Sequence, residues 1–182
     1  MKALKKICTV LMLLAFAFVF ASCSSGSDSD DDDDQSITLS DGSYTLAITQ
    51  TSDGMVEKYD IKATASNESW TFKSGSKTQT VDLTKQMSTD ELAKFNAMDD
   101  DSKKAEAKKN MKFPDDAEIS FADNKVIVKS TLSAAELTEM QENYQLSSIP
   151  SNAKIETIKD KTEYEITMSI EGTTIVFHVN KD

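Results

Sequence analysis

The stretch EYEITMSIEGTTIVFHV, residues 163–179, decides the fold. Apolar side chains occupy every second position from Tyr164 to Ile170 and again from Ile175 to Val179. Such alternation is typical of a strand that buries one face, and the intervening Glu171-Gly172 step is typical of a tight hairpin. The sequence therefore predicts two antiparallel strands that share one apolar face.

The same pattern occurs near residue 50. Apolar side chains alternate with polar ones over 44–48 and over 59–63, and Ser52-Asp53-Gly54 lies between the two segments. Because aspartate and glycine readily adopt the backbone angles of turns, we expect a second hairpin here.

Two helix starts carry the same local signal. Ser88 with Glu91, and Ser133 with Glu136, have the spacing of a capping box, in which the two side chains satisfy the first free amides of a helix. Each box is bracketed by an apolar pair that is able to pack as a staple, namely Met87 with Leu92 and Leu132 with Leu137.

The capping boxes lie 45 residues apart, and the preceding segments also match at this offset, for example Val81 with Val126. Each unit would be a hairpin, turning at Ser74-Gly75-Ser76 or at Asp123-Asn124, followed by a capped helix. Internal duplication is one interpretation, and the general similarity of hairpin–helix units is the other. Under both we expect an α+β fold: an antiparallel sheet of about eight or nine strands in hairpins, with two or three helices packed on it.

A further helix is expected from about Ser102 to Lys112, and Pro114 should end it. Lys104, Lys108 and Lys112 follow helical spacing and form a basic row. One interpretation is a solvated face balanced by the acids at 99–101; the other is a docking face for an acidic partner or lipid headgroups. These three lysines are the candidate partner-binding residues.

The amino terminus has the features of an export signal. Three lysines precede an apolar run of about 14 residues from Ile7 to Phe20, which is shorter than a membrane span. The following Ala21-Ser22-Cys23 resembles the lipobox of bacterial lipoproteins, with Phe20 where leucine is usual. The resemblance covers residues 1–23 only, and it implies cleavage before Cys23 and lipidation of that cysteine.

Residues 23–36 contain six aspartates and almost no apolar side chain, so we expect a disordered acidic tether. The tether is interpreted as a plain spacer, as a surface-export address or as a loose divalent-cation site. The interpretation as a surface-export signal is based on a resemblance to lipoproteins that reach the outer face of the outer membrane. Since the run lacks the spacing, glycine and closing glutamate of a calcium loop, we predict no metal site. Residues 1–22 are then the signal, 23–36 the lipidated cysteine and tether, and 37–182 a single globular domain.

Composition narrows the function. Removal of residues 1–22 takes away three lysines and no acid, so the net charge changes from −11 to −14. An acidic chain repels nucleic acid, and we expect no nucleic-acid partner. The chain also has no arginine, which disfavours a phosphate-specific pocket. The only cysteines are Cys8 and Cys23, so the mature domain has neither a disulfide nor a cysteine nucleophile.

Catalytic motifs are missing from the sequence. His178 is the only histidine and projects from the polar side of its strand; five glycines form no phosphate-binding loop. Carboxylate pairs such as Glu163 with Glu165 are uninformative in so acidic a chain. Aromatic residues fall mainly on apolar strand faces, which indicates core packing or, as the sharper alternative, a cavity for a small apolar ligand. We expect no catalytic residue and no cofactor.

The sequence thus predicts an exported lipoprotein, anchored in the outer membrane and exposed at the cell surface, that binds a protein or glycan without catalysis. The alternative is a periplasm-facing lipoprotein that carries a small apolar ligand or contacts an envelope assembly. A carboxylate-dependent hydrolase is the most distant option. The membrane is expected as a partner through the lipid anchor.

Overall fold

The computed structural model describes residues 37–66, 69–110, 113–114, 116–145, 149 and 152–182. Cys23 and Lys112, and the signal and tether expected over 1–36, lie outside them. The described elements are the strands β1 (Gly42–Ser52), β2 (Met55–Ser66), β3 (Ser69–Asp82), β4 (Glu118–Ala122), β5 (Lys125–Thr131), β6 (Lys154–Lys159), β7 (Glu163–Ile170) and β8 (Thr173–Lys181), and the helices α2 (Leu83–Gln86), α3 (Thr89–Asn96), α4 (Asp100–Asn110) and α5 (Ala134–Asn143).

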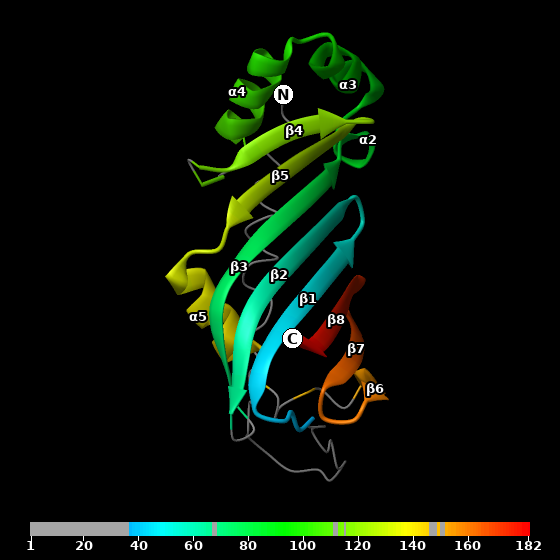
Figure 1. Cartoon of the computed structure of the whole chain (residues 1–182). Helices are drawn as coiled ribbons and strands as arrows, with labels where there is room; N and C mark the ends of the chain where they lie inside the picture. Colours follow the sequence, from blue (N-terminus) through cyan, green and yellow to red (C-terminus); the bar gives the residue numbers. More distant parts are fainter. Residues whose placement is uncertain (1–36, 67–68, 111–112, 115, 146–148, 150–151) are drawn as a thin grey trace, which may run out of the picture.

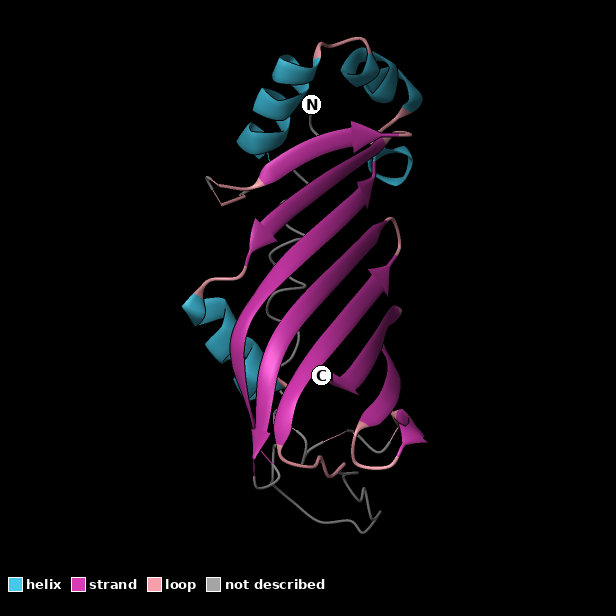
Figure 2. Cartoon of the chain, viewed as in Figure 1, coloured by secondary structure: helices cyan, strands magenta, loops and turns pink. Residues whose placement is uncertain are grey.

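The strands form one antiparallel sheet in the order β4-β5-β3-β2-β1-β8-β7-β6 (Figure 2). The expected antiparallel α+β class is confirmed, although strand predominates over helix. Four helices are described, where two or three were expected, because the chain makes a short turn, α2, directly after β3.

The local signals at two of the predicted turns and at both capped helix starts were correct. Asp53-Gly54 joins β1 to β2, and Glu171-Gly172 joins β7 to β8 with positive φ at both residues, as a tight hairpin requires. Both capping boxes are formed, at Ser88 with Glu91 and at Ser133 with Glu136.

The hairpin predicted at Ser74-Gly75-Ser76 was wrong, because β3 runs through these residues as one 14-residue strand. Gly75 instead allows a close approach: a Cβ there would lie 2.8 Å from Leu132 Cδ1 and 3.0 Å from the Asp60 carbonyl oxygen. The hairpin at Asp123-Asn124 does form. Since only the second unit is a hairpin followed by a helix, the structure does not reproduce the two-copy arrangement.

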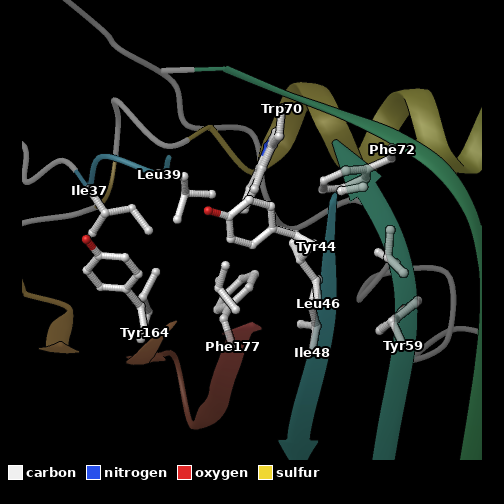
Figure 3. Packing of buried hydrophobic residues seen from close by; sticks show 14 of the residues in the cluster. Ile37, Leu39, Tyr44, Leu46, Ile48, Tyr59, Trp70, Phe72, Tyr164 and Phe177 are labelled. Atoms are coloured by element: carbon white, nitrogen blue, oxygen red, sulfur yellow. The ribbon is translucent and has the colours of Figure 1, made fainter. Parts of the chain in front are cut away.

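Apolar side chains gather on a single face of the sheet. The larger cluster includes Tyr44, Trp70 and Phe177 (Figure 3). Ile61 of β2 and Leu137 of α5 belong to the same cluster. The smaller one includes Val81, Val126 and Phe95 and lies toward α2, α3 and α4. The described helices therefore pack on the same face, and the opposite face carries none of them (Figure 1).

Candidate functional site

The predicted basic row lies on α4. Lys104 and Lys108 are exposed on this helix, which starts two residues earlier than expected and is capped by the Asp99 side chain, 2.8 Å from the Ser102 amide. Accepting from the Ser102 backbone and side chain lowers the pKa of Asp99. Ala107 is the only fully buried residue among 100–109, the part of α4 whose side chains the structure describes, so most of this helix surface faces solvent.

A row of buried polar side chains crosses the apolar face, and sequence reasoning missed it. Gln50, Glu57 and Gln79 are cross-strand neighbours on β1, β2 and β3, and each is less than 8% exposed. The row separates the two apolar clusters, with Ile48 on one side and Met55 on the other. The sequence did contain a signal for this row. Each of the three residues is polar but occupies a position of its strand where the alternation of apolar and polar residues predicts an apolar side chain.

Glu57 holds this row together. Its Oε1 accepts from Gln79 Nε2 at 2.6 Å and lies 3.0 Å from Lys77 Nζ, while its Oε2 accepts from the Tyr59 hydroxyl at 2.9 Å. Lys77 Nζ also lies 5.3 Å from the centre of the Tyr59 ring. Because both carboxylate oxygens are engaged by side chains of the sheet, this is an arrangement for stability.

Two phenols beside the row are kept neutral. Burial, with a contribution from the Glu57 carboxylate, raises the pKa of Tyr59 above its ordinary value. Burial also raises the pKa of Tyr144, whose hydroxyl accepts from Gln50 Nε2 at 2.8 Å. Tyr144 follows α5 and its ring packs edge-on against Phe177, so it joins the helix to the sheet.

Residues 37–41 are fastened to the end of the sheet. Ile37 and Leu39 are buried in the larger cluster (Figure 3), and the Tyr164 hydroxyl donates to the Thr38 carbonyl at 3.0 Å. Lys181 Nζ donates to the Asp41 carbonyl at 2.8 Å. The point at which the expected tether joins the sheet is therefore fixed by β7 and β8.

A small pocket of about 140 Å³ lies between α3, α4 and the β4–β5 turn, lined by residues that include Phe95, Lys103 and Asn124. Pockets for drug-sized ligands occupy roughly 300–1,000 Å³, so this hollow does not support the apolar-ligand alternative. Among the described residues, no group of three histidine, cysteine or acidic side chains is placed to hold a metal ion.

His178 lies on the face opposite the apolar clusters, as predicted. Its Nδ1 is 3.4 Å from Glu165 Oε2, and its side chain is about half exposed. The same face carries threonine, serine and lysine side chains along β1, β2 and β3, for example Thr49, Lys58 and Thr78, which neighbour one another across these strands. This helix-free surface is called the open face below.

The comparisons with known proteins gave no match, whether to family models, to curated proteins or to solved structures. Among the described residues, no helix is both long and apolar enough to cross a membrane.

Proposed function

We propose that the chain is an exported lipoprotein, anchored in the outer membrane through lipid on Cys23, and that it binds a protein or glycan at the cell surface without catalysis. The observation that carries the binding role is the open face. All described helices pack on the other side of the sheet, so side chains such as Lys58 and Thr51 remain available to a partner.

Two further features support a binding role. The sheet is fixed by regular cross-strand pairing, with one irregularity between β2 and β3 and another between β6 and β7, and rigid elements hold a contact surface more accurately than loops do. Glu57, the one fully buried charged side chain among the described residues, is engaged by Lys77, Gln79 and Tyr59. Its environment favours a structural role over that of an acid or base.

The anchor is tested by substitution. Cys23→Ala removes the sulfur that would carry the lipid, and we expect the protein to move from the membrane fraction to the soluble exported fraction. Ser22→Ala, which keeps the cysteine and a small residue before it, is the matched control and should stay in the membrane. Membrane retention of exported Cys23→Ala protein would contradict the anchor.

Surface exposure is tested by adding protease to intact cells, with a periplasmic protein as the control for integrity. We expect the domain to be digested while the control survives. Protection in intact cells, combined with digestion after lysis, would instead favour the periplasm-facing alternative. Digestion after lysis also shows that the folded domain is not intrinsically resistant.

A further inference from the structure

We propose that the outer edge of β4 binds an extended segment of a partner protein, which adds to the sheet as a further strand. This inference rests on the proposed binding function and goes beyond it, because it names a polypeptide as the partner and places the contact at the edge of the sheet. β4 is one terminal strand of the sheet, and β6 is the other.

The turn between β4 and β5 determines which backbone groups of β4 point outward. Asp123 and Asn124 have φ values of 49° and 59°, and a two-residue turn with positive φ at both positions is of type I′. In such a turn the carbonyl group of the residue before it accepts from the amide of the residue after it. Ala122 and Lys125, which are Cα partners, therefore form a hydrogen-bonded pair.

Hydrogen-bonded and non-hydrogen-bonded pairs alternate along an antiparallel ladder. Like Ala122, Ser120 and Glu118 therefore bond to β5, whereas the N–H and C=O groups of Ile119 and Phe121 point away from it. Among the described residues, no hydrogen bond other than the pairing with β5 involves the backbone of 118–122. The edge thus offers two donors and two acceptors at every second residue, the spacing that an extended chain matches.

The other terminal strand is protected against such pairing. Lys154, Glu156 and Lys159 of β6 are exposed, and an irregularity interrupts its pairing with β7 between Thr157 and Lys159. Charges and bulges of this kind keep edge strands from pairing with other chains. β4 has a regular register, no proline and a single charged side chain, Glu118.

A further stretch of edge, on β3, is covered by α5. β5 pairs with β3 only from Ser76 onward, which leaves residues 69–75 without a strand on that side. Gln141 Oε1 of α5 accepts from the Phe72 amide at 2.8 Å, and the Gly75 carbonyl accepts from the Leu132 amide at 2.9 Å. β4 is therefore the terminal strand whose edge is neither covered in this way nor interrupted.

The position of α4 favours a single extended segment over a second copy of the chain. α4 packs against β4 on the apolar side, where Ala107 and Ile119 belong to one cluster (Figure 1). A second copy paired through the same edge would bring its own α4 to about one strand spacing, 4.8 Å, from this one. Packed helices lie about 8–10 Å apart, so the two helices would collide, whereas an isolated strand carries no helix.

The inner neighbour of β4 indicates which side chains the segment should carry. Val126 of β5 lies opposite Phe121, which is only partly buried, and Lys129 lies opposite Glu118. Apolar residues should therefore alternate with polar ones, with an apolar residue beside Phe121. No acid should lie opposite Glu118, because like charges that face each other across strands destabilise the pair.

The edge is also well placed to meet a partner. Residues 37–41, which follow the expected tether, are fastened by β7 and β8, and β4 and α4 lie at the opposite end of the sheet (Figure 1). In a chain anchored through Cys23, this edge is far from the point of attachment.

The test uses the lipidated full chain in non-ionic detergent, with a fluorescein-labelled peptide that copies residues 125–131 as the probe. The peptide should not displace β5, which a two-residue turn holds beside β4 at a far higher effective concentration. We expect saturable binding, with slower hydrogen–deuterium exchange at the Ile119 and Phe121 amides when peptide is added. In the free protein these two amides should exchange faster than those of Ser120 and Ala122.

Phe121→Ala and Phe121→Pro are a matched pair, because both lose the ring and only the proline also loses the outward N–H. Proline is tolerated in an edge strand where the N–H faces solvent, so circular dichroism should be unchanged. Phe121→Pro should bind the peptide about fivefold more weakly than Phe121→Ala, the factor expected for one net hydrogen bond. Two peptides methylated on alternate sets of backbone nitrogens repeat the test on the unsubstituted chain, even if Phe121→Pro fails to fold: one should lose binding and the other should keep it.

Equal affinities of folded Phe121→Pro and Phe121→Ala, binding of both methylated peptides, or peptide-induced protection on β6 instead of β4 would overturn the assignment of the edge. Absence of peptide binding, or a dimer in sedimentation whose Ile119 and Phe121 amides are already protected, would overturn the choice of partner. None of these outcomes alters the fractionation of Cys23→Ala or the protease result, so failure of this inference is distinct from failure of the proposed function.

Discussion

Replacement of Glu57 by alanine should destabilise the fold without affecting the open face. The carboxylate accepts from Tyr59 and Gln79 and pairs with Lys77, so its removal leaves two buried donors without their acceptor. Each buried donor left unsatisfied costs about 1–3 kcal/mol. Lys77 is 26% exposed and can turn toward solvent, so its loss of a partner adds little. The expected decrease in the free energy of unfolding is about 3 kcal/mol.

Urea unfolding provides the assay. Trp70 is the only tryptophan, it is 8% exposed, and its indole nitrogen donates to the Tyr144 carbonyl at 2.7 Å. Its fluorescence therefore reports loss of the larger apolar cluster, and far-ultraviolet circular dichroism should give a coincident transition if unfolding is two-state. Glu57→Gln, which keeps the shape and one acceptor oxygen, should lose about half as much stability as Glu57→Ala.

The contribution of the Glu57–Lys77 ion pair to stability can be measured separately from the other contacts of the row. In a double-mutant cycle with Lys77→Ala, we expect an interaction energy of about 1 kcal/mol, because Lys77 is partly exposed. A Glu57→Ala protein that unfolds within about 0.5 kcal/mol of the unsubstituted chain would refute the reasoning, since it would mean that water replaces the carboxylate at no cost.

Three further changes test the structure. Gly75→Ala should cost about 1–3 kcal/mol through overpacking, as judged by urea unfolding, whereas Ser76→Ala on the exposed side of the same strand should be nearly neutral. Ser133→Ala removes the cap of α5 and should cost about 1 kcal/mol in the same assay. Tyr59 and Tyr144, whose pKa values are raised by burial, bind protons more tightly when folded, so the free energy of unfolding should fall as pH rises above about 10, and the phenolate absorbance of these two residues should appear only on unfolding.

The sequence predictions succeeded where neighbouring residues determine the structure, and failed where residues far apart in the chain determine it. Glu171-Gly172 and the capping box at Ser133 were predictable because a few consecutive residues determine them. Gly75 was misassigned because a glycine is required both by many turns and by a close approach, and only the position of Leu132 distinguishes the two. The Glu57 cluster was missed because its partners lie on separate strands, although the break in alternation marked the position.

The pairing of β2 with β3 links the two faces of the sheet. Glu57 pairs with Gln79 on the buried face, and the next pair along, Lys58 with Thr78, lies on the open face. A slip of one residue would expose the carboxylate row and bury lysines, so the buried contacts that fix this register also determine which side chains the open face presents.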